Sequence, residues 1–163
     1  MPYVSAAATE PTSVVAPHLR PELFISELRS RKKSSVLEEM VATLALARVT
    51  RHPDAVLDVL RRREALGSTG IGRGIAVPHA RATMVSERAL VVARSKKGVA
   101  FDAMDGNPSH LLFLIVAPPI ERDPIYLKLV AEIVKAVRLA RTRQRILEAP
   151  GFDAVRDTLV QAL

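Results

Sequence analysis

The chain has 163 residues, of which 48% are hydrophobic and 25% charged, a size and composition typical of one globular domain. It contains no cysteine, which excludes disulfides, thiol nucleophiles and thiolate metal sites. The formal net charge of +7 favours an anionic partner, but the four phenylalanines and two tyrosines do not alternate with basic runs as single-stranded nucleic acid binding requires. No apolar run is long enough to span a membrane, and no secretory signal pattern is present, so we expect a cytoplasmic location.

The first half of the chain predicts a tail, a short strand and two helices. Residues 1–20 lack apolar periodicity, so we expect a loose tail before a single domain over residues 21–163. Residues 23–28 alternate as a short strand does, with Phe24, Ser26 and Leu28 on one face. Apolar residues at helical spacing then predict one helix over residues 34–47 and a second over residues 53–63.

The second half predicts strands followed by helices. Four glycines within residues 67–74 argue against regular structure there. Short aliphatic runs predict buried strands at residues 75–77, 90–93 and 111–117, with residues 99–101 as a further candidate. Helical spacing returns over residues 124–138 and in a last helix after Gly151. Arginines 138–145 are expected in a solvated face and interhelix loop rather than in a nucleic-acid patch. This order predicts an α/β fold in which a mixed central sheet lies between helices, a three-layer α/β/α sandwich.

The segment GSTGIGRGIAVPHAR, residues 67–81, combines glycine flexibility with a histidine and arginines. It lacks the lysine of a phosphate-binding Walker loop, and Ile75 stands where a dinucleotide fingerprint needs its third glycine. Pro78 fixes its own backbone and keeps Val77 extended, so His79 is presented in a defined direction. A neutral imidazole can accept a phosphoryl group, which makes His79 a candidate acceptor.

Other residues are candidates for supporting a phosphate. Arg63 follows Val56 and Val59 on one helical face and is expected to offer paired donors; the alternative is a surface arginine with a buried stem. Thr69 and Gly70 contribute a hydroxyl and loop amides, or are simply turn residues. His110 begins an apolar strand and is either a further support or a satisfied buried histidine. The histidine spacing fits no metal motif, so no metal and no cofactor are expected.

The run STGIGRGIAVPHAR, preceded by RREALG and followed by HLLFLIVAP, resembles the enzyme IIA domain of the fructose–mannitol class of the bacterial phosphotransferase system, including its nitrogen-regulatory branch. The resemblance covers about residues 20–163. It implies that His79 takes a phosphoryl group from the histidine-containing phosphocarrier protein, with Arg63 in support. Where the family commonly carries a second active-site histidine, in a segment like HLKLL, this chain reads YLKLV from Tyr126. A phenol cannot carry positive charge, which implies slower transfer or a site kept for signalling, unless Tyr126 is a packing residue.

Three functions are compatible with these observations. The first is a phosphohistidine phosphocarrier, of the nitrogen-regulatory kind, that docks its donor through an apolar collar including Ile71 and Ile75. The second is a regulator that acts by protein binding with weak or no phosphotransfer. The third is a basic nucleic-acid-binding module, supported only by the charge. Because the family's IIB domains of this class use a cysteine, no IIB domain is expected within this chain, and a separate IIB protein or a regulated target remains a candidate partner.

Overall fold

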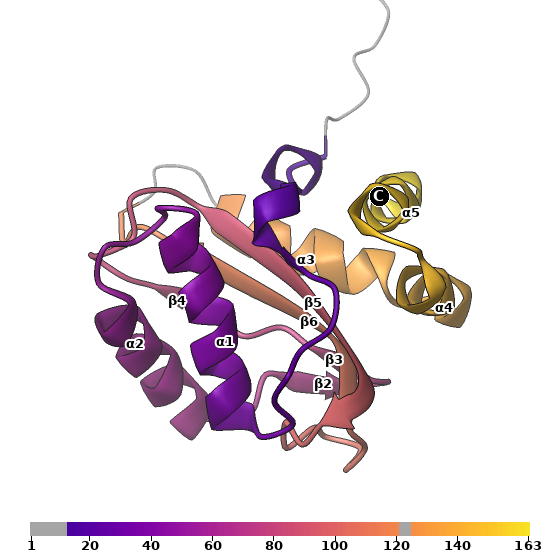
Figure 1. Cartoon of the computed structure of the whole chain (residues 1–163), viewed down its shortest axis with the longest axis horizontal. Helices are drawn as coiled ribbons and strands as arrows, with labels where there is room; N and C mark the ends of the chain where they lie inside the picture. Colours follow the sequence, from indigo (N-terminus) through magenta and orange to yellow (C-terminus); the bar gives the residue numbers. More distant parts are fainter. Residues whose placement is uncertain (1–12, 121–124) are drawn as a thin grey trace, which may run out of the picture.

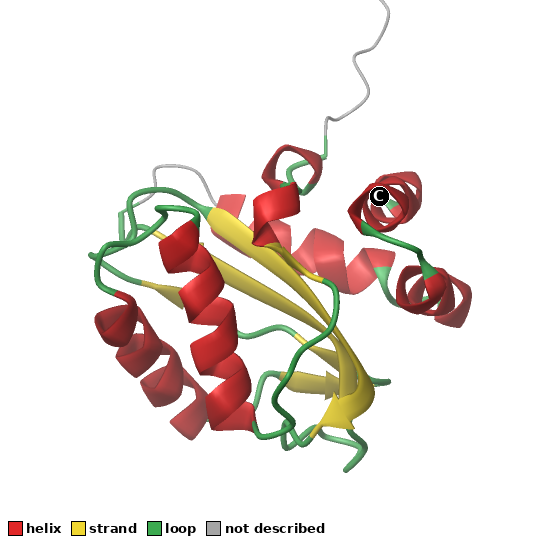
Figure 2. Cartoon of the chain, viewed as in Figure 1, coloured by secondary structure: helices red, strands yellow, loops and turns green. Residues whose placement is uncertain are grey.

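A mixed sheet lies between two layers of helices in the computed structural model, which describes residues 13–120 and 125–163 (Figures 1 and 2). The strands are β1 (Phe24–Ile25), β2 (Gly70–Gly72), β3 (Ile75–Ala76), β4 (His79–Arg81), β5 (Ala89–Val99) and β6 (Ser109–Ala117). The helices are α1 (Lys33–Leu46), α2 (Pro53–Ala65), α3 (Ile125–Ala136), α4 (Ala140–Glu148) and α5 (Phe152–Ala162), with 3-10 turns at Ala16–His18 and Pro21–Leu23.

The strand order is β1-β5-β6-β3-β2, and β4 also pairs with β6. The β5–β6 pair is antiparallel, whereas β1 runs parallel to β5, and both β3 and β4 run parallel to β6. Ile75 lies opposite Leu111 and His79 lies opposite Ile115, so β3 and β4 follow each other along one side of β6. The interruption between them is Val77–Pro78, because proline has no N–H to donate to the ladder. His79 is thereby set at the start of a new strand.

The side chains of β6 divide the core into two parts. Leu112, Leu114 and Val116 pack with α1 and α2, and the residues between them pack with α3, α4 and α5. A strand buried on both faces needs a continuous apolar sequence, which is why residues 111–117 carry no polar side chain. The predicted three-layer α/β/α fold is confirmed.

The predicted loose tail is wrong for its last eight residues. Val15 is fully buried in the core beside α3, and the Glu132 carboxylate accepts hydrogen bonds from the Ser13 hydroxyl at 3.0 Å and from the Val14 N–H at 3.1 Å. Val14 and Leu19 also pack against this part of the core, but three apolar residues in a short segment give only a weak sequence signal. Residues 1–12 lie outside the described part of the chain.

Several element predictions also need correction. Helix α4 lies where a loop was expected. It buries only Thr142 and Ile146, and its three arginines make the sequence mostly polar, which hides this short buried face. The glycine-rich segment contributes β2, and β5 continues through the candidate strand at 99–101 only as far as Val99. Leu28 packs with the α1–α2 side of the core and Phe24 with the other side, so they do not share a face.

Among the described residues, no helix combines the length and the apolar character needed to cross a bilayer.

Candidate functional site

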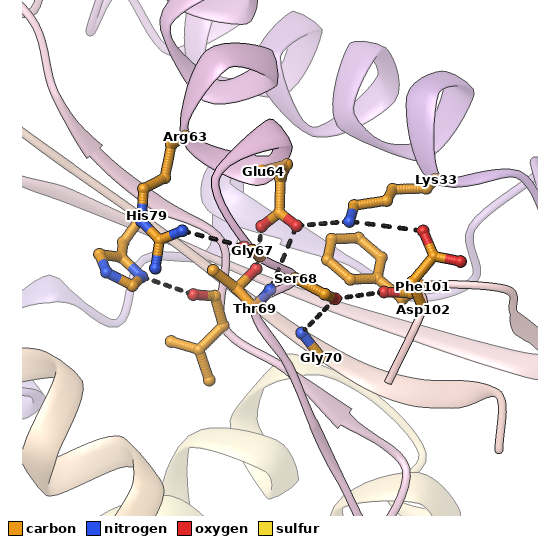
Figure 3. Close-up of polar contacts among 11 residues, drawn as sticks. Lys33, Arg63, Glu64, Gly67, Ser68, Thr69, Gly70, His79, Phe101 and Asp102 are labelled. Carbon is orange, nitrogen blue, oxygen red and sulfur yellow. Dashed lines mark hydrogen bonds and ion pairs between the residues drawn. The ribbon is translucent and has the colours of Figure 1, made fainter. Parts of the chain in front are cut away.

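His79 is the first residue of β4 and is half-buried. Its Nδ1 lies 2.7 Å from the carbonyl oxygen of Val77 (Figure 3). Because a carbonyl oxygen can only accept a hydrogen bond, this contact places the ring proton on Nδ1. The lone pair of the neutral ring is then on Nε2, which is the atom available as a nucleophile or base.

Arg63 lies in the last turn of α2 and is half-buried. Its Nη1 donates a hydrogen bond to the Gly67 carbonyl oxygen at 3.0 Å, which uses one of the five N–H donors of the guanidinium group. Helix α2 packs against β4, and Figure 3 shows the Arg63 side chain reaching down to the His79 ring. The structure therefore brings together the two residues that the sequence singled out.

Tyr126, in the first turn of α3, completes the surroundings of His79. Its ring is 6% exposed and tilted by 57° against the His79 ring, with centroids 5.9 Å apart. The guanidinium carbon of Arg81 lies 4.7 Å from the centroid of the Tyr126 ring, a cation–π contact. Arg81 is a second cation of the site that the sequence reasoning did not single out. The signal was its spacing, because residues two apart in a strand share a face.

The polar groups of Thr69 and Gly70, which were candidates for holding a phosphate, have hydrogen-bond partners within the protein. Thr69 is 4% exposed, and its hydroxyl and its N–H both donate to the carboxylate of Glu64. The Gly70 N–H donates to the Ser68 hydroxyl oxygen at 3.0 Å. A Cβ at Gly70 would lie 2.9 Å from the Cα of Ala103, so glycine is needed there for close packing of two backbones.

Two further predicted residues lie away from the reacting atoms. His110 sits five positions before Ile115, the partner of His79, on β6, a displacement of roughly 17 Å along the strand. Its Nδ1 lies 2.8 Å from the Ser95 carbonyl oxygen, so it is held within the sheet. Ile75 is 2% exposed and belongs to the core, which removes it from the predicted docking collar. Ile71 is 39% exposed and remains accessible.

The sequence reasoning missed Glu64, which is 9% exposed. Its carboxylate lies 2.5 Å from Lys33 Nζ at the start of α1 and binds Thr69 as described. The signal was in the helix pattern, because Leu57, Leu60 and Glu64 fall on one face of α2. A carboxylate at the end of a buried apolar face needs partners, and the structure supplies them.

One carboxylate near the glycine-rich segment has a shifted pKa. The backbone N–H groups of Arg73 and Asn107 donate to Asp105 at 2.9 and 3.0 Å and lower the pKa of that exposed carboxyl. The contact ties the turn between β2 and β3 to the loop after β5. The described part of the chain holds no group of three or more histidine, aspartate or glutamate side chains arranged to bind a metal ion.

Comparison with known proteins identifies the family. Residues 17–162 match the model of the phosphoenolpyruvate-dependent sugar phosphotransferase system, EIIA 2. A nitrogen regulatory protein of Bradyrhizobium diazoefficiens is 33% identical over 139 residues, which cover 85% of this chain and 90% of that protein. The fructose-specific EIIABC component of Bacillus subtilis is 34% identical over 134 residues, which cover 82% of this chain but only 21% of that longer protein. The chain belongs to the EIIA 2 family of this phosphotransferase system.

Solved structures agree with this assignment. The nitrogen regulatory protein IIA-Ntr of Neisseria meningitidis superposes with a TM-score of 0.82 at 27% identity, covering 90% of this chain and 99% of that one. The mannitol enzyme IIA of Escherichia coli, solved in complex with phosphorylated enzyme IIB, has the same fold, with a TM-score of 0.74 at 19% identity over 88% of this chain and 97% of that one.

Proposed function

We propose that this protein is a phosphohistidine carrier of the phosphotransferase system, which accepts a phosphoryl group on Nε2 of His79 from the histidine-containing phosphocarrier protein. The observation that carries the proposal is the hydrogen bond from His79 Nδ1–H to the Val77 carbonyl oxygen, because it leaves Nε2 as the reactive atom. The family assignment supports phosphotransfer over a role in protein binding alone.

The transfer conserves atoms and charge without a base. The lone pair of Nε2 attacks the phosphorus of a donor phosphohistidine whose other ring nitrogen is protonated. The donor N–P bond breaks, its electrons return to the donor nitrogen, and the donor leaves as a neutral imidazole. Because Nδ1 keeps its proton, phosphorylated His79 carries a positive ring. The Val77 carbonyl oxygen accepts a hydrogen bond from that ring and stabilises the charge.

The dianionic phosphoryl group needs positive charge close to it. Arg63 approaches from α2, and Arg81 follows His79 on β4 and is steadied by the Tyr126 ring. Guanidinium groups stay charged at every relevant pH and match the oxygens of a phosphoryl group in pairs. Two arginines from different elements therefore make up for the absence of a second histidine at position 126.

Docking requires an accessible surface around the acceptor. Exposed apolar side chains border the glycine-rich segment: Leu66, 86% exposed, Ile71, 39%, and Met104, 87%. Met104 is held there because its N–H donates to the Gly70 carbonyl oxygen at 3.2 Å. We name these three residues the docking collar, with Leu66 and Met104 replacing the buried Ile75. An apolar collar excludes water while two histidines exchange a phosphoryl group.

The likeness to nitrogen regulatory proteins over nearly their whole length supports a regulatory version of this function. In that version the phosphorylation state of His79 determines which target protein binds the collar. A separate IIB protein is the alternative acceptor, by analogy with the mannitol complex. Either role places the protein in the cytoplasm, where the phosphoenolpyruvate that drives the system is made.

The test is incubation with phosphoenolpyruvate, enzyme I and the phosphocarrier protein, followed by intact-mass measurement. The wild type should gain one acid-labile phosphoryl group, and His79→Ala should gain none. His110→Ala is the matched control, because His110 also lies on a strand with Nδ1 bound to a carbonyl oxygen. Phosphorylation of the His79→Ala protein at the wild-type level would refute the assignment.

A further inference from the structure

Glu64 stands at one end of a chain of hydrogen bonds that ends at His79, and Figure 3 shows its first and last links. Its carboxylate accepts from the Thr69 N–H at 3.1 Å. The Thr69 carbonyl oxygen accepts from the Val77 N–H at 3.0 Å, and the Val77 carbonyl oxygen accepts from His79 Nδ1 at 2.7 Å. Thr69 and Val77 each donate one of these hydrogen bonds through the backbone N–H and accept the next through the carbonyl oxygen. The chain is therefore continuous from Glu64 to His79.

The Glu64 end of this chain is fixed from several sides. Lys33 Nζ lies 2.5 Å from Glu64 Oε2, and the exposed fractions of the two side chains are 18% and 5%. The same ammonium group lies 4.8 Å from the centroid of the Phe101 ring and 3.7 Å from Asp102 Oδ2. A nearly buried carboxylate with these partners has little freedom to move. It is therefore a rigid reference point at the C-terminal end of α2.

The loop after α2 also holds the Arg63 side chain. The Gly67 N–H donates to the Glu64 carbonyl oxygen at 3.1 Å, and the Gly67 carbonyl oxygen accepts from Arg63 Nη1 at 3.0 Å. On its other side, the Ser68 hydroxyl donates to the Phe101 carbonyl oxygen at 2.6 Å. The acceptor histidine and its arginine are thus both positioned relative to residues 67–69.

We infer that Glu64, held by Lys33, is a positioning residue for phosphotransfer. Glu64 fixes the position of Thr69, and Thr69 in turn fixes the Val77 carbonyl group. The Val77 carbonyl group then determines the Nδ1–H tautomer and the direction of the His79 ring. Glu64 touches neither the phosphoryl group nor the reacting atoms. The inference rests on the proposed function, and it adds the residue that determines which ring nitrogen reacts.

A purely structural role for Glu64 predicts something different. If the carboxylate only held α1 and α2 together, its loss would lower the melting temperature and leave the His79 ring unchanged in the folded protein. Positioning predicts that the tautomer changes while the protein is folded. The tautomer is read directly from the imidazole nitrogen shifts of His79, in phosphate-free buffer and without any partner.

The chain offers matched variants. Glu64→Gln removes the charge with little change in shape, and Thr69→Val removes only the hydroxyl contact with Glu64. Thr69→Ser keeps that hydroxyl and serves as the conservative rescue. Glu38→Gln is the control, because Glu38 and Arg61 form another ion pair between α1 and α2, at 2.6 Å, on the exposed side of these helices.

We expect folded Glu64→Gln and Thr69→Val to lose the strict Nδ1–H tautomer of His79. Their kcat for transfer from the phosphocarrier protein should fall between about ten- and a hundredfold, the cost of misplacing a reacting group, with little change in KM. Thr69→Ser and Glu38→Gln should match the wild type in both measurements. If Glu64→Gln does not fold, Thr69→Val decides the question alone.

The inference is overturned if the folded variants keep the wild-type tautomer, or if Glu38→Gln changes the His79 ring as much as they do. A fall in kcat without a change of tautomer also overturns it, because the effect would then not pass through His79. If the wild type accepts no phosphoryl group, the proposed function fails, and the tautomer comparison still decides whether Glu64 positions the ring.

Discussion

His79 and His110 show how neighbours decide what a histidine does. Both bind a carbonyl oxygen through Nδ1, at 2.7 and 2.8 Å, and in the neutral ring both therefore carry the lone pair on Nε2. Only His79 lies at the start of a strand beside a helix that carries Arg63, with Arg81 two residues further on. In the proposed function, the fixed tautomer prepares the nucleophile, and the two cations make the position suitable for a phosphoryl group.

Arg63→Lys should slow transfer from the phosphocarrier protein by at least about tenfold, or ~1.4 kcal/mol in the barrier. Lysine keeps the charge but loses the paired donors and the directed bond to the Gly67 carbonyl oxygen. Arg62→Ala is the control, because Arg62 is 80% exposed and paired with Asp58 on the solvent side of α2. Stopped-flow transfer rates measure the effect; equal rates for Arg62→Ala and Arg63→Lys would show that Arg63 is an ordinary surface arginine.

Tyr126→Phe keeps the ring contacts with His79 and Arg81, so transfer should weaken by no more than one hydrogen bond, about 0.5–1.5 kcal/mol. Tyr126→Ala removes a buried ring and should lower the free energy of unfolding by about 3–5 kcal/mol. Phosphohistidine lifetime and thermal unfolding report the two effects. Should the phenylalanine variant lose the phosphoryl group as fast as the alanine variant, the hydroxyl, not the ring, is what the site uses.

At the scale of elements, the loops around β2 and β3 are joined by hydrogen bonds, and one of them can be tested by pH. Asp105→Asn should lower the melting temperature above about pH 5, because the pKa of Asp105 is lowered in the folded protein by N–H groups that bind its charged form. The sign follows from the lowered pKa: the stabilisation is complete above the unfolded pKa of about 3.9 and disappears as pH falls through the folded value. Calorimetry from pH 7 downward should show the two melting curves converging. A constant difference across that range would contradict the assignment.

The elements with strong periodicity were predictable, and so was their layering. Helices α1 and α2 and strand β6 follow their apolar patterns closely, because packing on a sheet imposes those patterns. Helix α4 was not predicted because arginines dominate its sequence. Strand β2 was not predicted because its two glycines give no strand pattern, and its pairing with β3 depends on tertiary structure.

The candidate site was predictable in part. His79 and Arg63 could be found because a proline, a glycine loop and a helical face each restrict where a side chain points. Thr69 and Ile75 were misjudged, since only tertiary contacts show that the first binds Glu64 and the second is core. Local rules describe direction well, whereas burial of a loop residue depends on segments that are distant in the chain.

At the scale of the whole molecule, the candidate site combines residues from the sheet and from both helical layers. Arg63 comes from the α2 layer, His79 and Arg81 from the sheet, and Tyr126 from the α3 layer. The docking collar lies on the loop after α2, on β2 and on the loop after β5.

Ile71→Asp should raise KM for the phosphocarrier protein by about tenfold, equivalent to ~1.4 kcal/mol of binding, and leave the melting temperature unchanged. A charge in the collar must be desolvated on docking, whereas in the free protein it stays in water. Val160→Asp on α5 is a control of similar exposure, 45% against 39%, in the opposite helical layer. A similar rise in KM for both variants would show that the collar is not the docking surface.

The most direct measurement for the central claim is nuclear magnetic resonance of the phosphorylated protein with nitrogen-15 in its histidines. We expect phosphorus–nitrogen coupling at Nε2 of His79, with Nδ1 still protonated and bonded to the Val77 carbonyl oxygen. A phosphoryl group on Nδ1 of His79, or on any other residue, would contradict it.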